Sequence, residues 1–300
     1  MRTVVTGGAG FIGSHLSEAL LARGDEVCVV DNLASGKREN VPAGARFEER
    51  DVRDGLADLF DELAPDACFH LAAQADVVTS VDRPVYDAEV NVLGTLRVLE
   101  AAGTRTQVVF SSTGGAIYGE CERPATEDDP RRPLSPYGTS KLAGEEYLAT
   151  WNRLYGTAHV ALRLANVYGP RQEAGLEGGV VAIFLERMAR ADETLIFGDG
   201  LQARDFVSVA DVVEALLVAP GHAGGVFNVG TGIATSVVEL HALCRLVSGS
   251  EREATFADAR PGEVRRSVLD PGFAKRELGW RARVGLEDGL RTTWGWLTAS

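Results

Sequence analysis

The sequence predicts an α/β protein built on a doubly wound parallel sheet, with helices on both faces of the sheet. Two observations support this class. Short runs of β-branched and apolar residues alternate with helical patterns through the first half of the chain, and continuous apolar strands of this kind are typical of a sheet that is buried on both faces. The chain also has 300 residues and 45% hydrophobic content, which suits one large domain or a domain with a smaller lobe.

Strands and helices can be assigned in order along the first half. Strands are expected at Arg2–Thr6, Glu26–Asp31, Ala45–Glu49, Ala67–Leu71, Gln107–Ser111 and His159–Leu164. Amphipathic helical patterns lie between several of them, at Phe11–Arg23, Asp87–Ala102 and Tyr137–Tyr155. Right-handed crossovers between these strands produce a Rossmann-type fold, in which a ligand binds at the carboxyl ends of the strands.

After about Val167 the alternation loosens. A helix is expected at Val180–Ala191, a return to the main domain at Phe206–Ala219, a strand at Val226–Val229 and a final helix at Leu286–Leu297. We therefore expect one domain formed by residues 1–165 with about 205–230, and a smaller, discontinuous substrate-binding lobe formed by 166–204 and 231–300.

The composition excludes some classes of partner. The formal net charge is 30 − 43 = −13, which disfavours a generic nucleic-acid binder or a membrane-surface protein because both need a basic face. No apolar run reaches the roughly 18–20 residues needed to cross a bilayer, and no leader pattern is seen at the N-terminus. The four cysteines are far apart and include no Cys-x-x-Cys pair, so we expect a cytoplasmic protein with reduced thiols and no metal site.

A glycine loop follows the first strand and opens the first helix. Gly8, Gly10 and Gly13 satisfy G-x-G-x-x-G, and Gly7 offers a looser variant of the same spacing. Without Cβ atoms the backbone can approach a pyrophosphate, which the helix N-terminus attracts. Asp31 ends the second strand, where a carboxylate accepts the ribose hydroxyls of NAD and repels the extra phosphate of NADP. Lys37 and Arg38 lie nearby and leave NADP as the lesser alternative.

Tyr137 and Lys141 form the second motif. The chain has only three lysines, and this one stands four residues after a tyrosine, on the same face of a predicted helix. An ammonium group beside a phenol lowers the phenol pKa from about 10 toward neutrality. The pair can therefore act as a base and an acid on an alcohol while a nicotinamide exchanges hydride with the carbon.

Further segments occur in a fixed order with these motifs: Asp31-Asn-Leu, Asp51-Val52, His70-Leu-Ala-Ala-Gln74, Ser111-Ser-Thr113, Arg163-Leu-Ala-Asn166, Arg204-Asp-Phe and Arg260-Pro-Gly-Glu263. Together they resemble the extended short-chain dehydrogenase/reductase superfamily, in particular its NAD-dependent nucleotide-sugar epimerases of the UDP-glucose 4-epimerase kind. The resemblance implies that NAD contacts Gly7, Gly10, Phe11, Ile12, Asp31, Asn32, Ser35, Gly36, Asp51, Val52, Leu71, Ala72, Ala73, Gln74, Asn91, Ser111, Tyr137 and Lys141.

The same resemblance implies the catalytic and substrate-binding residues. A triad of Thr113, Tyr137 and Lys141 is expected, with Ser112 as the alternative hydroxyl. A UDP-sugar would contact Thr113, Tyr137, Asn166, Gly179, Val180, Ile196, Phe197, Arg204, Arg260, Glu263 and Ser267. The small Ser267 stands at the position that limits pocket size in the family, so room for an N-acetyl group is expected.

The expected reaction is inversion at C4 of a UDP-hexose through a transient 4-keto sugar. Related dehydratases and decarboxylases place acidic residues after the threonine, whereas this chain has Gly114 and Gly115 there. A UDP-glucuronate 4-epimerase or another epimerase or dehydratase remains the alternative enzyme, and an NAD(P)-sensing protein is the alternative without catalysis. Asp87–Ala102 and Tyr137–Tyr155 resemble the helices that build the family's homodimer.

Overall fold

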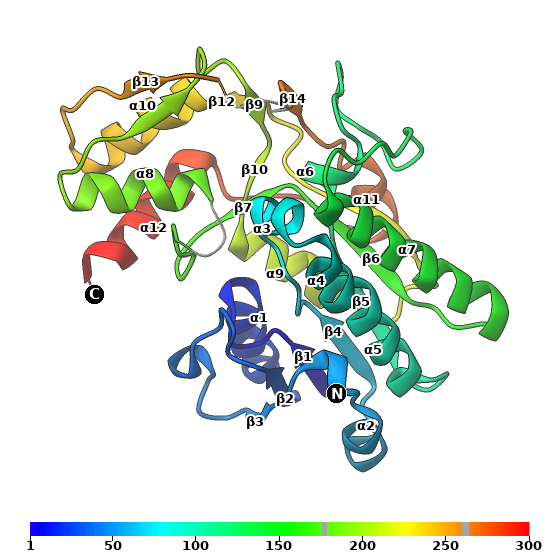
Figure 1. The fold of residues 1–300 in the computed structure, drawn as a ribbon. Helices are drawn as coiled ribbons and strands as arrows, with labels where there is room; N and C mark the ends of the chain where they lie inside the picture. The colour runs from blue at the N-terminus through cyan, green and yellow to red at the C-terminus, as the bar shows by residue number, and fades with distance from the viewer. Residues whose placement is uncertain (176–178, 260–263, 300) are drawn as a thin grey trace.

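In the computed structural model, which describes residues 1–175, 179–259 and 264–299, seven parallel strands form the central sheet. The spatial order β11-β6-β5-β4-β1-β2-β3 reverses direction at β1, as a doubly wound sheet requires. Figure 1 shows the sheet edge-on between its helices. The strands are β1 (Arg2–Thr6), β2 (Glu26–Asp31), β3 (Arg46–Glu49), β4 (Ala67–His70), β5 (Gln107–Thr113), β6 (Val160–Leu164) and β11 (Gly225–Val229).

The predicted strands are confirmed to within one residue at each end, except that β5 continues two residues further, to Thr113. Its polar end is held in the sheet by β6, because Ser112 pairs with Arg163 and Thr113 with Leu164. The extension places the predicted catalytic hydroxyl at the carboxyl edge of the sheet.

Helices cover both faces of the sheet, and each face has its own apolar core. One core packs α1 (Phe11–Ala22) and α9 (Val209–Val218) against the sheet, with α11 (Gly272–Glu277) at its edge. The opposite core packs α2 (Ala57–Leu63), α5 (Gly94–Ala102) and α7 (Pro136–Tyr155) against the other face. These two layers confirm the Rossmann-type α/β class.

The helix expected at Asp87–Ala102 begins earlier and is not uniform. It consists of α4 (Pro84–Ala88), a π-helical turn η3 (Glu89–Leu93) and α5. Such turns are frequent at functional sites, and this one carries Asn91. Short elements that the pattern did not predict are η1 (Arg38–Asn40), η2 (Val52–Asp54), α3 (Val77–Asp82) and α6 (Gly114–Ile117), besides α2 and α11.

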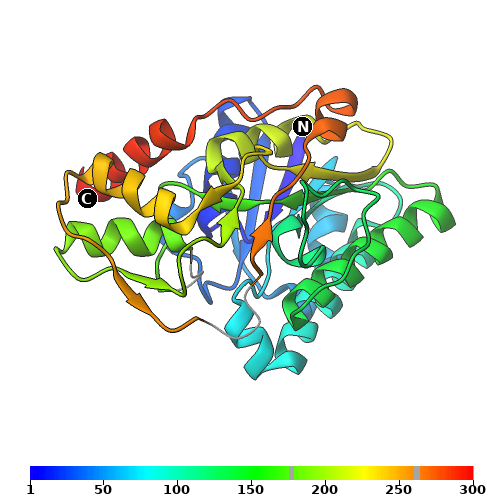
Figure 2. The same ribbon diagram turned by 90° about the horizontal axis from the view of Figure 1, so that it is seen from above.

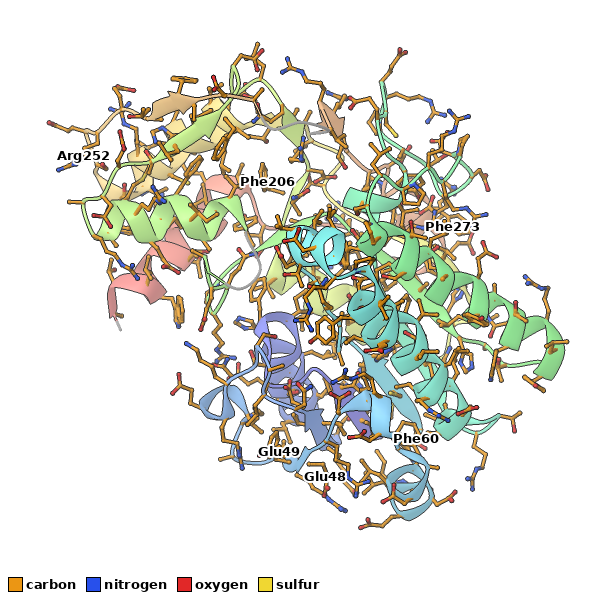
Figure 3. All side chains as sticks on the ribbon, viewed as in Figure 1. Glu48, Glu49, Phe60, Phe206, Arg252 and Phe273 are labelled. Carbon is orange, nitrogen blue, oxygen red and sulfur yellow. The ribbon has the colours of Figure 1, made fainter. Side chains whose placement is uncertain are left out.

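A third apolar core lies outside the main sheet. Helices α8 (Val180–Ala189), α10 (Val237–Ser248) and α12 (Leu286–Ala299) pack together around it, on the side of the molecule opposite α7 (Figure 2). The side chains labelled in Figure 3 mark the three cores, since Phe60, Phe206 and Phe273 each belong to or pack against a different one. The exact division of the chain at residues 166–204 and 231–300 stays a prediction.

Three small sheets accompany this third core. They join β10 (Phe206–Ser208) to β7 (Asn166–Tyr168), β13 (Thr255–Ala257) to β8 (Leu195–Phe197), and β9 (Ala203–Arg204) to both β12 (Thr235–Ser236) and β14 (Arg266–Ser267). Among the described helices, none has the length and apolar character needed to cross a membrane.

Candidate active site

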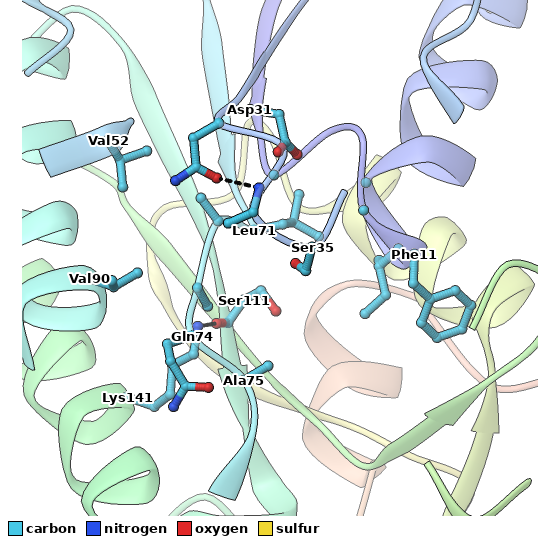
Figure 4. Close-up of a pocket in the computed structure, with 18 of the residues that line it drawn as sticks. Phe11, Asp31, Ser35, Val52, Leu71, Gln74, Ala75, Val90, Ser111 and Lys141 are labelled. Atoms are coloured by element: carbon cyan, nitrogen blue, oxygen red, sulfur yellow. Dashed lines mark hydrogen bonds between the residues drawn. The ribbon is translucent and has the colours of Figure 1, made fainter. Parts of the chain in front are cut away.

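A cavity opens at the carboxyl ends of β1, β2, β4, β5 and β6, where the fold predicts a ligand (Figure 4). The structure brings most of the predicted residues into its lining: Gly7, Gly10, Phe11, Ile12, Asp31, Asn32, Ser35, Asp51, Val52, Leu71, Ala72, Ala73, Gln74, Ser111, Ser112, Thr113, Tyr137 and Lys141. Residues that the sequence did not single out also line it, including Ala34, Arg50, Ala75, Tyr86, Val90, Leu164, Ala165 and Val167.

The glycine loop is packed so closely against the neighbouring backbone that larger residues would clash at two of its positions. Gly7 has φ of +70°, and a Cβ there would lie 2.6 Å from the Ala72 nitrogen, while a Cβ on Gly13 would lie 2.2 Å from the Gly7 oxygen. Gly10 caps the N-terminus of α1, so the positive end of that helix faces the cavity. A helix N-terminus with free backbone N–H groups is suited to bind the pyrophosphate of a dinucleotide.

Asp31 ends β2 with its carboxylate fixed by backbone donors. Ala9 N donates to Oδ2 at 3.0 Å and Leu33 N donates to Oδ1 at 2.8 Å. Burial raises the pKa of this carboxyl, while the two backbone hydrogen bonds lower it. The free lone pairs that line the cavity are suited to accept ribose hydroxyls.

Lys37 and Arg38, the cations that the sequence left open for NADP, are held by other groups, and so is Arg50, which lines the cavity but donates to Asp58. Lys37 forms an ion pair with Glu173, and the Arg38 guanidinium lies 4.3 Å from the centre of the Phe47 ring. Neither residue belongs to the described lining of the cavity. This arrangement favours NAD over NADP, whose extra phosphate needs a cation close to the ribose.

Lys141 lies in the interior beside the last residues of β5. Its Nζ donates to the Ser111 carbonyl at 2.8 Å and lies 4.8 Å from the centre of the Phe110 ring; Figure 4 shows the hydrogen bond. Burial lowers the pKa of this ammonium from 10.5 to about 8, and the negative charges of Asp87 and Glu145 partly oppose that shift. Lys141 therefore lines the cavity as an ammonium group that loses its proton more easily than an exposed lysine does.

The two candidate hydroxyls, Ser112 and Thr113, both line the cavity but have different surroundings. Ser112 Oγ donates its one hydrogen to Glu145 Oε1 at 2.5 Å. Thr113, the next residue, points to the other face of the strand and lines the cavity at 8% exposure. The assignment of Thr113 as the catalytic hydroxyl, with Ser112 as the alternative, stays a prediction.

Asn91 lies one layer behind the cavity instead of in its described lining. Its side chain exchanges hydrogen bonds with the backbone of Gln74, at 2.9 Å to the Gln74 nitrogen and 2.8 Å to the oxygen. Asn91 and Gln74 both donate to the buried Asp87 carboxylate at 3.0 Å. Asn91 thus holds the loop that lines the cavity. Gly36 is also absent from that lining; a Cβ there would meet Ala9 and Asp31.

Two predicted substrate residues, Asn166 and Ser267, lie near Gly115, two residues after Thr113. A Cβ on Gly115 would lie 3.6 Å from Asn166 Oδ1 and 3.8 Å from Thr113 Oγ1, and Ser267 Oγ donates to the Gly115 carbonyl at 3.5 Å. Ser267 also pairs with Arg204 between β14 and β9. Gly179, Val180, Ile196 and Phe197 lie at the start of α8 and in β8, outside the described lining. Arg260 and Glu263 lie outside the described residues.

Within the described residues, no group of three or more His, Cys, Asp or Glu side chains could hold a metal ion.

A dinucleotide cradle on a doubly wound sheet, with a tyrosine–lysine pair and a hydroxyl at its mouth, defines an enzyme of the extended short-chain dehydrogenase/reductase class. The profile of the NAD dependent epimerase/dehydratase family matches residues 3–230, and the chain belongs to that family.

Several proteins are similar to this chain over nearly its whole length. The UDP-glucose 4-epimerase of Mycolicibacterium smegmatis is 47% identical over 98% of this chain and 97% of its own length. A UDP-glucose 4-epimerase of Thermotoga maritima, solved with UDP-glucose, superposes with a TM-score of 0.96 at 46% identity, covering 100% of this chain and 99% of its own. The Thermus thermophilus enzyme in complex with NAD gives 0.95 at 46% identity and covers 100% of both chains.

Proposed function

We propose that the protein is an NAD-dependent epimerase that inverts C4 of a UDP-hexose, with UDP-glucose and UDP-galactose as its substrates. One observation carries the proposal: Lys141 is bonded to the carbonyl of Ser111 on the strand that presents Thr113, in the same cavity as Tyr137 and the glycine loop. The full-length similarity to UDP-glucose 4-epimerases supports the substrate.

Each residue of the triad has a separate task in this proposal. Tyr137 takes the proton of the C4 hydroxyl and later returns it, and the positive charge of the Lys141 ammonium stabilises the phenolate. Thr113 donates a hydrogen bond to the reacting oxygen. Bound NAD supplies the hydride acceptor and donor that the exchange at C4 requires. The glycine loop and Asp31 would hold this cofactor, by the cradle and the fixed carboxylate described above.

The nucleotide-sugar is proposed to extend from the cavity to residues of the smaller lobe. Asn166 lies beside Gly115 and Thr113, and Ser267 stands next to Arg204 in the paired strands β9 and β14. Arginine meets diphosphate oxygens with two donors, so Arg204 and Arg260 are proposed to bind the diphosphate. Glu263 is proposed for the uridine ribose, with Gly179, Val180, Ile196 and Phe197 near the uracil.

We also propose a cytoplasmic homodimer. All four cysteines are free, as a reducing compartment allows. Helices α3, α4 and α7 and the turn η3 carry large exposed apolar side chains, namely Val77, Val78, Val81, Val85, Leu93, Tyr147, Leu154 and Tyr155. A second copy of the chain would bury them. Light scattering that finds a monomer at micromolar concentration would contradict the dimer.

Product analysis tests the reaction and the sugar together. Purified protein is incubated with UDP-galactose, UDP-N-acetylgalactosamine or UDP-galacturonate, and the products are identified by NMR. Conversion of UDP-galactose to UDP-glucose is expected. Turnover of UDP-galacturonate alone would reassign the substrate, and loss of water or carbon dioxide would reassign the reaction.

A single substitution tests the role of Tyr137. Tyr137→Phe removes the hydroxyl that exchanges the proton, so this variant should retain NAD and lose turnover. Near-normal activity in Tyr137→Phe would overturn the catalytic assignment.

A further inference from the structure

A fully buried ion pair lies behind the cavity, between α7 and the sheet. The side chains of Glu145 and Arg163 are each 2% exposed, and Arg163 Nη2 lies 2.7 Å from Glu145 Oε2. Arg163 Nε donates to Oε1 of the same carboxylate at 2.9 Å. A buried pair of this kind is weak evidence for stability, because apolar residues of similar volume often replace it without loss. The neighbours of the Glu145–Arg163 pair indicate a role other than stability.

The pair is bonded to the strand that carries the reacting groups. Ser112, which donates to Glu145 Oε1 at 2.5 Å, stands between Ser111 and Thr113 on β5. Ser111 in turn accepts from Lys141 Nζ at 2.8 Å. Two consecutive residues of the strand are therefore bonded to side chains one turn apart on α7.

Tyr137, Lys141 and Glu145 follow one another at intervals of four residues, so they share one face of α7. Two bonds from that face to one strand restrict both the rotation of the helix and its position along its axis. Because Tyr137 lies on this helix and Thr113 on this strand, the same bonds fix how far the two reacting hydroxyls lie from each other.

The other end of the pair holds the turn that follows Thr113. Arg163 Nη1 donates to the Tyr118 hydroxyl at 2.6 Å, and that hydroxyl donates to Asn228 Oδ1 at 2.8 Å. Tyr118 follows directly after α6, the short helix that begins at Gly114. The ion pair therefore restrains the chain on both sides of Thr113. Glu145 accepts a hydrogen bond from Ser112, the residue before Thr113, and Arg163 donates one to Tyr118, at the end of the short helix after it.

We infer that Glu145 and Arg163 are positioning residues for the proton transfer, acting through Ser112 and Tyr118 on the geometry of Thr113, Tyr137 and Lys141. The described lining of the cavity includes neither residue, so they act without touching the substrate. This inference rests on the proposed epimerase function. It makes Ser112, the alternative candidate for the catalytic hydroxyl, a link between the ion pair and the strand.

The test separates position from stability. Glu145→Leu combined with Arg163→Met removes both charges of the pair together, and Asp87 remains as the carboxylate that stabilises the Lys141 ammonium. We expect this double variant to unfold near the wild-type temperature and to retain NAD. Its kcat should fall on the order of 10²-fold, the cost of a displacement of about 1 Å in a reacting group, with KM nearly unchanged.

Glu146→Gln is the matched control. Glu146 is the next residue of α7, and its ion pair with Arg131 is exposed, so its loss should leave kcat unchanged. Wild-type kcat in the double variant, at wild-type unfolding temperature, would overturn the inference.

Two further variants make every result decisive. If the double variant fails to fold, Tyr118→Phe removes only the hydroxyl that joins Arg163 to Asn228, at a residue outside the described lining of the cavity. It should lower kcat without raising KM, and wild-type kcat in Tyr118→Phe overturns the inference. Tyr137→Phe is assayed in parallel. Activity in Tyr137→Phe refutes the proposed mechanism itself, whereas an inactive Tyr137→Phe beside a fully active double variant refutes only the positioning role.

Discussion

Replacing Lys141 with methionine should stabilise the dinucleotide-free protein while it abolishes turnover. Burial lowers the pKa of the Lys141 ammonium from 10.5 to about 8. A difference of 10.5 − 8 = 2.5 pKa units corresponds to about 3 kcal/mol at 1.36 kcal/mol per unit. At pH 7 the native state bears this penalty, because the folded chain must keep a charged lysine in its interior.

Methionine has a similar length and no charge, but it cannot donate to the Ser111 carbonyl as Lys141 does. The lost hydrogen bond costs about 1 kcal/mol. Lys141→Met should therefore raise the free energy of unfolding by ~2 kcal/mol at pH 7, which chemical denaturation can resolve.

The pH dependence gives this prediction a second signature. Between pH 8 and 10.5 the unfolded chain still binds the lysine proton while the native state has released it, so the stability of the wild type rises with pH. The advantage of Lys141→Met should be full below pH 8 and should vanish by about pH 10.5. Denaturation curves at pH 7 and pH 10.5 measure both limits.

Lys275→Met is the matched control, since Lys275 is exposed on α11. This variant should show no difference from the wild type that changes with pH. If Lys141→Met is less stable than the wild type at pH 7, or if its difference does not change with pH, then Asp87 and Glu145 fully compensate the buried ammonium and the reasoning is refuted.

Two further substitutions test the cavity. Gly7→Ala should abolish NAD retention because its Cβ would lie 2.6 Å from the Ala72 backbone, whereas Gly24→Ala, at a φ of +90° with no atom within 4 Å, should bear only left-handed strain and keep NAD. Equal retention by the two variants, measured from the dinucleotide released on denaturation, would show that the cradle does not depend on Gly7. Ser267→Tyr should fill the space beside Gly115 and remove turnover of UDP-N-acetylgalactosamine while sparing UDP-galactose. Product NMR measures both substrates, and an equal loss of the two would contradict the gating role.

The sequence predicted those features that depend on neighbours in the chain. β1 and β2 match their predicted bounds because apolar runs and turns define them locally. The glycine loop and the Tyr137–Lys141 spacing are local in the same way. The end of β5 was missed because Ser112 and Thr113 are polar, and only their pairing with Arg163 and Leu164 on β6 keeps them in the sheet.

The residues behind the cavity could not be predicted in this way. Ser112 and Glu145 are 33 residues apart, and Glu145 and Arg163 are 18 apart, so no spacing rule joins them. Asp87 and Asn91 stand four residues apart, as many residues on any helix do, and their bonds to Gln74 become visible only once the chain is folded. Burial of a charge is a property of the packed layer, which composition and periodicity do not reveal.

That layer shows how one chemical requirement extends to residues that never meet the substrate. Lys141, Arg163, Asp87 and Glu145 are all buried, at 3%, 1%, 1% and 2% exposure, and their charges sum to zero. A lone ammonium in such a place would lose its proton or destabilise the fold. The two carboxylates raise the pKa of Lys141 against the effect of burial, and Arg163 in turn balances Glu145 through three hydrogen bonds to its carboxylate. In the proposed mechanism Tyr137 depends on the Lys141 ammonium. The two carboxylates stabilise that buried ammonium, and Arg163 is in turn the ion-pair partner of Glu145. The positioning network is therefore also the charge balance that allows Lys141 to stay protonated beside Tyr137.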